Sequence, residues 1–402
     1  MRHILIFLLL FSCAFSIYGY SRITIERTWI VEDAEGAHIN FTGNLIVNNS
    51  NQRVVSLTID PKASHSTNED GVISVHYNGT INDNHFSIKG IAIVDVDYNT
   101  NIYSDSNVPL STLSSTNLTM PNNEIRTEAQ LLANHNSSLK TVKDLVNWVH
   151  NYVEYDLNYW GRSNSAQDVF NEKRGVCVEY SHLLISMARS VGFDTRYVSG
   201  YVLTTSWQPH AWVEIYIPNY DWLPVDATFD QVGILDSGHV AISYGDDQST
   251  SYDLLLANRQ NITMEVQNSL TEQFSIEDPK GASLSIDFDN QSNIVTVSIM
   301  NERSEYLFGN YMTQLPDEYG GVQSTVLLLN PNENIYRYYG LNLSLFNSHY
   351  VYTIPVYSSF NDAKDDELIK ITGTAPNGAS ASPELCPAAF LLLGFLCIRA
   401  VH

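Results

Sequence analysis

Hydrophobic and polar residues alternate with a period of two between residues 22 and 110. Alternation of this kind, broken at short intervals by Asn, Gly and Asp, is typical of antiparallel strands with one buried face. The pattern predicts strands at residues 23–31, 38–47, 54–59, 71–77 and 86–94. We therefore expect residues 20–110 to form an all-β sandwich domain.

The period changes after a segment rich in Ser, Thr and Asn, and we predict a linker over residues 111–127. Apolar residues then recur at helical spacing over residues 125–135 and 141–153. A third apolar stripe begins at Val178 and stops at Gly192, a residue type that is preferred at helix ends. These three segments are predicted to be helices.

Strands are predicted again after the third helix, at residues 195–203, 210–217 and 222–228. Helices followed by strands predict a helix packed on an antiparallel sheet, so we expect an α+β domain over residues 128–260. Alternation then returns and predicts a second sandwich over residues 261–375, with strands at 283–288, 294–299, 324–329, 351–357 and 368–372. The predicted fold class is therefore α+β, with a helix-on-sheet core flanked by two all-β sandwich domains.

Both ends of the chain carry apolar runs that are too short to span a bilayer, which takes about 20 residues. The run over residues 4–15 follows a basic residue and precedes small ones, so residues 1–19 are predicted to be a secretory signal peptide. Residues 376–402 contain a polar spacer, a short apolar stretch and Arg399. They indicate a sorting or anchoring segment that attaches the protein to a membrane or cell envelope, or else a helix docked on the fold.

We therefore expect a secreted or cell-surface protein. Sequons for N-glycosylation agree with export and predict a glycoprotein, at Asn40, Asn48, Asn78, Asn117, Asn136, Asn261, Asn290 and Asn342. The formal net charge of -23, with only 21 Lys and Arg residues, argues against a nucleic-acid partner, which basic side chains would have to bind.

Cys177 is the only cysteine between residues 14 and 385, so it has no partner for a disulfide in the body of the chain. It is either a small buried apolar residue or a nucleophile. Gly175 precedes it, and the helical stripe begins directly after it. At a helix N-terminus, unpaired N–H groups and the helix dipole favour a thiolate, and a neighbouring imidazolium lowers the thiol pKa further.

A thiolate nucleophile needs a base and a group that orients the base. His210 opens one predicted strand, and Asp226 lies on the next. If the connecting loop is of odd length and centred on Asn219, Asp226 pairs with Trp212 and lies on the same face as His210. An even loop would turn Asp226 to the other face. Taken singly, His210 also fits an exposed strand end, and Asp226 fits a turn.

Three motifs in this order resemble the core of the transglutaminase-like superfamily: Gly-Val-Cys ending at Cys177, His-Ala-Trp beginning at His210, and Asp-Ala-Thr beginning at Asp226. The resemblance covers roughly residues 128–235. It implies a papain-like fold in which Cys177 is the nucleophile, His210 the general base and Asp226 the orienting carboxylate. Trp160 and Trp207 line a substrate groove, help to hold the oxyanion, or serve packing, and packing is the expected role of each.

The resemblance implies acyl transfer on peptide or glutamine-type amides of a protein or peptide substrate, through an acyl-thioester. We expect hydrolysis, as in a cysteine peptidase or amidase, ahead of transglutaminase cross-linking. A non-catalytic surface scaffold or adhesion protein is the alternative from another class. The sequence predicts no cofactor and no metal site, because it shows no metal-ligand spacing, calcium-type acidic cluster or phosphate-binding glycine loop.

Overall fold

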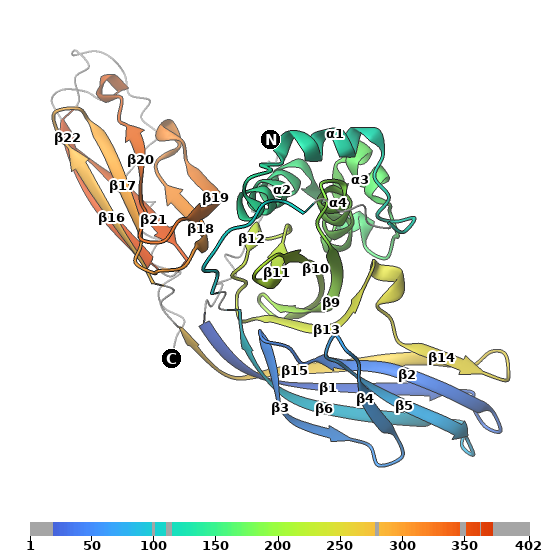
Figure 1. Ribbon diagram of the computed structural model, residues 1–402. Coiled ribbons are helices and arrows are strands. Elements are labelled where there is room, and N and C mark those ends of the chain that lie inside the picture. Colours follow the sequence, from blue (N-terminus) through green and yellow to red (C-terminus); the bar gives the residue numbers. More distant parts are fainter. Residues whose placement is uncertain are drawn as a thin grey trace, which may run out of the picture.

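The computed structural model of the chain describes residues 19–98, 101–109, 115–277, 281–345, 351–361 and 363–372. It contains an N-terminal β domain, a central domain of helices and strands, and a C-terminal β domain (Figure 1). The predicted α+β class is therefore confirmed. The predicted signal peptide, apart from Gly19, and the predicted segment 376–402 lie outside the described residues. Within the described ranges, no helix is both long and apolar enough to cross a membrane.

The N-terminal domain is a sandwich of two 4-stranded sheets, ordered β15-β1-β6-β3 and β14-β2-β5-β4. Burial alternates residue by residue along β1, as the sequence pattern predicts. Trp29 and Phe41 pack edge to face in the core, with ring centroids 5.4 Å apart. The strands are β1 (Gly19–Glu32), β2 (His38–Val47), β3 (Gln52–Ile59), β4 (Ser64–Thr67), β5 (Val72–Thr80), β6 (Phe86–Asp97), β14 (Leu254–Ala257) and β15 (Thr263–Glu277).

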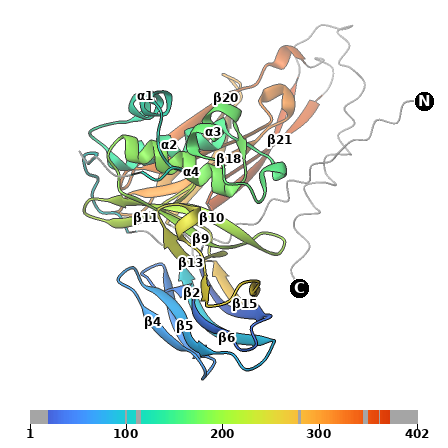
Figure 2. The same cartoon turned by 90° about the vertical axis from the view of Figure 1, so that its right-hand side faces the viewer.

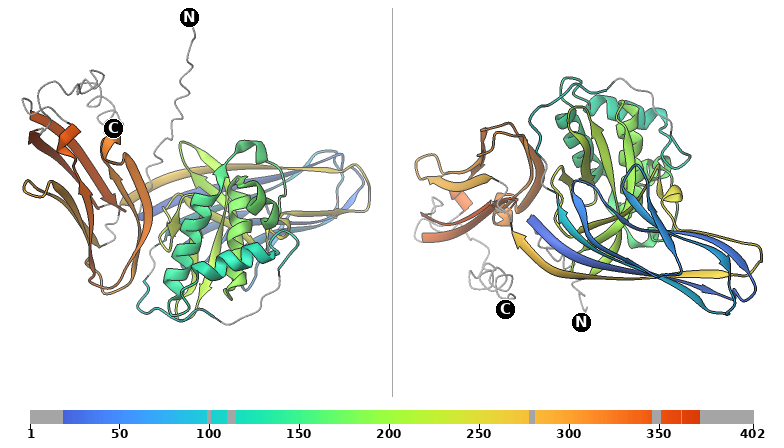
Figure 3. Two further views of the ribbon diagram at one scale, coloured as in Figure 1. Left: turned by 90° about the horizontal axis from the view of Figure 1, so that it is seen from above. Right: turned by 60° about the horizontal axis from the view of Figure 1, so that its bottom comes forward.

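Two of these strands come from the far side of the central domain in the sequence. β14 pairs with β2, and β15 pairs with β1 from Gly19↔Glu277 to Glu32↔Thr263 (Figure 3). The boundary expected at residue 261 therefore differs from the structure, since β15 belongs to the N-terminal sandwich. Alternation in a strand shows that one face is buried, but it does not identify the sheet edge that the strand joins.

The central domain places helices over a 5-stranded antiparallel sheet of order β12-β11-β10-β9-β13 (Figure 2). The helices are α1 (Asn123–Leu132), α2 (Ser138–Tyr152), α3 (Ala166–Glu172) and α4 (Cys177–Ser190). The strands are β9 (Thr195–Leu203), β10 (Trp207–Ile217), β11 (Asp221–Asp226), β12 (Gln231–Val232) and β13 (His239–Gly245), with the short parallel pair β7 (Glu154–Tyr155) and β8 (Arg174–Gly175). α1 begins inside the expected linker 111–127, because Asn122 caps it by accepting from the Ile125 N–H.

The central sheet and the N-terminal sandwich share one hydrophobic core. Ile46 and Val47 of the sandwich belong to the same buried cluster as Trp212 and Val240 of the sheet. Gln52, also fully buried, clamps the two parts together. Its amide donates to the Ala241 carbonyl and its oxygen accepts from the Ala241 N–H, each at 2.8 Å, so the polar backbone of β13 is satisfied by a side chain from the sandwich.

The C-terminal domain pairs a 3-stranded sheet, β16-β17-β20, with a 4-stranded sheet, β19-β18-β21-β22. It meets the central domain through Asp230, whose carboxylate accepts from Asn147 and from the Val326 N–H. The strands are β16 (Ala282–Asp289), β17 (Ile294–Asn301), β18 (Leu307–Gln314), β19 (Val322–Leu329), β20 (Asn334–Gly340), β21 (Val351–Phe360) and β22 (Ala363–Thr372). Short 3-10 helices complete the described elements: η1 (Leu157–Tyr159), η2 (Gln248–Thr250), η3 (Asp317–Tyr319) and η4 (Leu343–Leu345).

Gln52→Leu should destabilise the contact between the sandwich and the central sheet. The change leaves the N–H and carbonyl of Ala241 without partners in a buried place, at a cost of about 1–3 kcal/mol for each unsatisfied group. Thermal unfolding should therefore begin at a lower temperature than in Gln130→Leu, which makes the same change at an exposed position. Equal unfolding curves for the two variants would show that Gln52 does not hold the domains together.

Candidate active site

Cys177 is the first residue of α4, which confirms the predicted position at a helix N-terminus. The helix start is held by Glu179, whose carboxylate accepts from the Val176 N–H at 3.0 Å. Gly175 is required because a Cβ there would lie 2.2 Å from the Cβ of Glu179. Glu179 is fully buried, and burial raises its pKa. The Gly-Val-Cys motif therefore serves close packing at the start of this helix.

His210 and Asp226 meet because β10 and β11 have the predicted register. Val213 pairs with Val225 and Ile217 with Asp221, so the turn is centred on Asn219. Continued by one step, this register sets Asp226 against Trp212, on the face of His210. The His210 Nε2 atom lies 2.6 Å from Asp226 Oδ2, and both side chains are buried. The odd-loop alternative is thus confirmed.

The three predicted site residues come together in one series, with His210 between Cys177 and Asp226. The His210 ring is hydrogen-bonded to Asp226, and Cys177 lies close enough to the ring to raise the pKa of His210. Since Nε2 faces the carboxylate, Nδ1 is the ring nitrogen left for the thiol. Cys177 is 4 % exposed, which suits a small buried residue, but its position next to a buried, charged histidine sets it apart from an apolar filler.

The electrostatics of the series favour a charged imidazole. Burial alone would lower the pKa of His210, but the charge of Asp226 and hydrogen bonds to Asp226 and Cys177 raise that pKa to about 10. Burial would raise the pKa of Asp226, yet the charges and hydrogen bonds of His210 and His239 hold it well below its usual range. At neutral pH the site therefore presents an imidazolium next to Cys177.

His239 and Asp236 are members of the site that sequence reasoning missed. His239 Nε2 lies 3.2 Å from Asp226 Oδ2, and its Nδ1 lies 3.1 Å from Asp236 Oδ1. His239 opens β13, which reaches β10 only across β9. The one signal in the local sequence is a histidine at the start of an otherwise apolar run. Such a pattern does not indicate which residue the histidine contacts.

Aromatic rings enclose the imidazole of His210. Trp212 stacks on it with ring centroids 6.0 Å apart, and Phe229 lies at 5.2 Å. Gly200, the β9 partner of His210, leaves room for these rings, because a Cβ there would lie 2.7 Å from the Trp212 ring and 2.2 Å from the Val240 oxygen. Because these rings exclude water, the attraction between the charges of His210 and Asp226 is stronger than it would be in solvent.

An exposed aromatic side chain lies beside Cys177. Tyr155 pairs through β7 with Gly175, and it is 46 % exposed. Burial of the rest of this side chain and the negative charge of Cys177 raise the pKa of Tyr155 to about 12. Leu157 and Trp160 follow it and are 70 % and 58 % exposed. Trp207, the other tryptophan predicted to line a groove or serve packing, is partly buried against the core shared with the sandwich.

His210, Asp226 and His239 are also the group that could hold a metal ion in the described part of the chain, with their ligand atoms within 4.8 Å of one another. Two ligands on a tetrahedral zinc at 2.0–2.1 Å lie about 3.3 Å apart. The contact of 2.6 Å between His210 and Asp226 is shorter and is a hydrogen bond. The three residues as arranged form a proton-sharing network.

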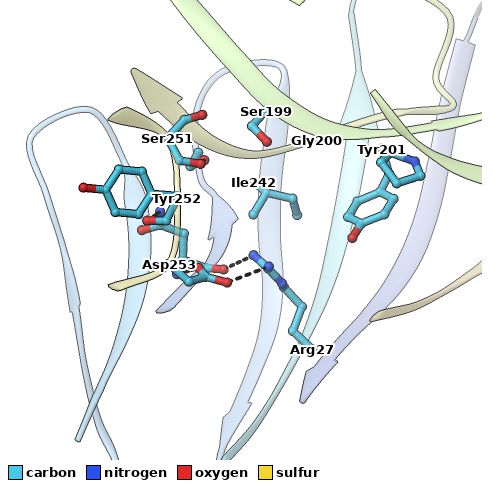
Figure 4. A pocket seen from close by; sticks show the side chains of 11 residues that line it. Arg27, Ser199, Gly200, Tyr201, Ile242, Ser251, Tyr252 and Asp253 are labelled. Atoms are coloured by element: carbon cyan, nitrogen blue, oxygen red, sulfur yellow. Dashed lines mark hydrogen bonds and ion pairs between the residues drawn. The ribbon is translucent and has the colours of Figure 1, made fainter. Parts of the chain in front are cut away.

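A cavity of about 270 Å³ lies elsewhere, between the N-terminal sandwich and the central sheet (Figure 4). Arg27 and Asp253 point toward each other across it, with Arg27 Nη2 3.0 Å from Asp253 Oδ2. The Asp253 carboxylate also accepts from Trp29 Nε1 and from the Asn44 N–H. The charged side chains that line this cavity therefore have partners within the fold, as expected at a contact between two domains.

Asp226→Asn should flatten the dependence of stability on pH. The pKa values of His210 and His239 are raised from 6.5 to about 10 and about 9. Such histidines stabilise the fold fully below pH 6.5, and this contribution is lost as the pH rises through the raised values. The thermal midpoint of the parent should therefore fall between pH 6.5 and about pH 10, and that of the variant should fall less.

Asp144→Asn is the control for this scan, because Asp144 pairs with Lys140 and Lys143 and with no histidine among the described ion pairs. Its curve should run parallel to that of the parent. Parallel curves for parent and Asp226→Asn would contradict the assigned charge on the two histidines.

Comparison with known proteins agrees with this geometry. Residues 125–227 match the family model of the transglutaminase-like superfamily. An uncharacterized protein of Mycobacterium leprae is 28% identical over 127 residues, and one of Mycobacterium tuberculosis is 25% identical over 146 residues. These matches cover 29% and 32% of this chain and 45% and 46% of those proteins, so the chain spans about half the length of the curated relatives it matches.

Among solved structures, a putative cysteine protease from Cytophaga hutchinsonii is similar, with a TM-score of 0.47 and 21% identity, over 65% of this chain and 93% of that chain. Red sea bream transglutaminase is similar with a TM-score of 0.25 and 9% identity, over 85% of this chain and 78% of that one. Together, the motifs, their spatial arrangement and the family match identify the central domain of this chain as a member of the transglutaminase-like superfamily.

Proposed function

We propose that this protein is a cysteine acyl-transfer enzyme that acts on peptide or glutamine-type amides. One observation carries the proposal: Cys177 at the N-terminus of α4 lies next to His210, which is hydrogen-bonded to the buried Asp226. A nucleophile, a base and an orienting carboxylate in this series are what covalent amide chemistry needs. The three residues come from α4, β10 and β11, so the folded domain is needed to assemble them.

The first half-reaction makes an acyl-enzyme. The Cys177 thiolate attacks the carbonyl carbon, a C–S bond forms, and the carbonyl oxygen becomes an oxyanion. Backbone N–H groups in the first turn of α4 have no partner within the helix and are donors for this oxyanion. The imidazolium of His210 then gives its proton to the departing nitrogen, the C–N bond breaks, and an amine or ammonia leaves. A thioester on Cys177 and a neutral His210 remain.

The second half-reaction transfers the acyl group to an acceptor. His210 removes a proton from the acceptor as it attacks the thioester, the C–S bond breaks, and the thiolate–imidazolium pair is restored. We propose water as the usual acceptor, which makes the enzyme a peptidase or amidase. The exposure of Tyr155 supports this choice, because this residue pairs with Gly175 of the Gly-Val-Cys motif and is 46 % exposed to solvent. A lysine amine in place of water would give the cross-linking reaction.

We further propose that the protein acts outside the cell or at its surface. The apolar run over residues 4–15 and the spacer and apolar stretch within 376–402 support this location. A lone Cys177 without a disulfide partner in the body of the chain is compatible with it, because the thiol is buried. The proposed substrates are therefore extracellular or cell-envelope proteins and peptides.

Cys177→Ser should abolish turnover of a peptide mixture that contains both Gln and Lys residues, with a loss of at least about 10⁴-fold for the removal of a covalent nucleophile. Mass spectrometry of the parent reaction should show addition of water, as cleavage or deamidation. The control is Ser186→Ala, at another buried position on the same helix. Full turnover by Cys177→Ser would remove the proposal, and incorporation of an amine in place of water would favour cross-linking.

A further inference from the structure

His239 is a fully buried histidine to which the proposed reaction assigns no step. It lies outside the part of the chain that the family model matches, which ends at residue 227. Its ring packs edge-on against Trp212, with centroids 5.3 Å apart and an interplanar angle of 87°. Its centroid is 5.6 Å from that of His210. The two histidines are therefore neighbours on one carboxylate.

Both ring nitrogens of His239 face carboxylate oxygens. Nε2 faces Asp226 and Nδ1 faces Asp236, at 3.2 and 3.1 Å. An ionised carboxylate only accepts hydrogen bonds, so both nitrogens have to donate, and a ring that donates from both is an imidazolium. The positive charge of His239 therefore sits between two negative ones, which is how a buried charged group is compensated.

Asp226 is held on both of its oxygens. Oδ1 accepts from the Thr228 N–H at 2.7 Å, and Oδ2 accepts from His210 and from His239. The backbone bond fixes one oxygen only. A carboxylate with one oxygen fixed still turns about its last bond, and the donor at His239 removes this freedom for the oxygen that faces His210.

His239 is itself held in place from two directions. Asp236 accepts from the Gly238 N–H and from Gln231, each at 3.1 Å, which fixes the carboxylate behind the ring. Two residues further along β13, Ala241 is clamped by Gln52 of the N-terminal sandwich. The donor that meets Asp226 is therefore built on a strand that the sandwich stabilises.

We propose that His239 is a positioning residue for the Cys177–His210 pair: by donating to Asp226, it holds that carboxylate in the orientation that accepts from His210. The inference rests on the proposed function of Cys177. It predicts that His239 acts through Asp226 and that its Nε2 donor is the feature that matters. Gln places an amide nitrogen near the position of Nε2, whereas Asn places one near the position of Nδ1, so the two substitutions separate the two contacts.

The test is the rate at which iodoacetamide alkylates Cys177 at about pH 6, where an ordinary thiol reacts slowly because little of it is thiolate. The rate is followed on the peptide that contains Cys177 in the full chain, so no substrate is needed. Asp226→Asn should lower it about 10- to 100-fold, as the thiolate reverts to a thiol. His239→Asn should lower it about 10-fold, and His239→Gln should stay within about threefold of the parent.

The double variant Asp226→Asn with His239→Asn decides whether His239 acts through Asp226. It should react no more slowly than Asp226→Asn alone, because residues that act in series do not have additive effects. A product of the two single losses would overturn the inference, and so would a parent-like rate in His239→Asn. The control is His182→Asn, at a buried histidine whose Nδ1 faces the Asn164 carbonyl instead of a carboxylate.

Two readouts keep this inference separate from the proposed function. A parent protein whose Cys177 reacts like a free thiol would overturn the proposed function, whereas an activated parent with an unaffected His239→Asn variant would overturn only the inference. The ring nitrogens of His239 in the ¹⁵N-labelled parent, assigned by difference from His239→Gln, give a test that needs no active variant. Both should be protonated at neutral pH, and a ring without a proton on Nε2 would overturn the inference.

Discussion

The buried carboxylate of Asp226 is the group on which the geometry of the central domain depends. It has no exposure to solvent, so its charge is stable only while donors surround it. His210, His239 and the Thr228 N–H supply those donors from β10, β13 and the loop after β11. Loss of one partner would leave a buried charge uncompensated, at a cost of several kcal/mol. The strands are therefore bound to one another through their ends as well as through the sheet.

This constraint ties the site to the architecture of the whole molecule. The chain forms six strands of the N-terminal sandwich, then the central domain, and then returns with β14 and β15 to complete the sandwich. The central domain is thus inserted within the sandwich, and strands that follow it in the sequence complete both sandwich sheets. The sandwich in turn supplies Gln52, which holds β13 and with it His239. The geometry of the candidate site and the packing between the domains therefore both depend on β13.

The sequence predicted those parts of the site that local patterns encode. The apolar stripe after Cys177 marked a helix start, and the spacing around Asn219 allowed the register that brings Asp226 to the face of His210. The alternating strands of the sandwich were predictable for the same reason, since each pattern reports one buried face.

The sequence could not predict pairings between strands that lie far apart along the chain. β15 carries a clear alternation, but nothing in it indicates that β1, more than 200 residues earlier, is its partner. The contact of His239 with Asp226 could not be predicted either. It depends on two strand pairings, β13 with β9 and β9 with β10, that bring distant parts of the chain together. The packing of Gly175 against Glu179 likewise becomes visible only when the helix is in place.

The most direct test of the account is the ultraviolet absorbance of the thiolate, taken as the difference between the parent and Cys177→Ser from pH 4 to pH 9. The account predicts that a thiolate persists well below the ordinary thiol pKa of about 8.5, because the imidazolium of His210 stabilises it. The same difference measured in the His210→Ala background should appear only near that ordinary value. A parent that itself titrates near 8.5 would contradict the central claim that Cys177, His210 and Asp226 form one activated unit.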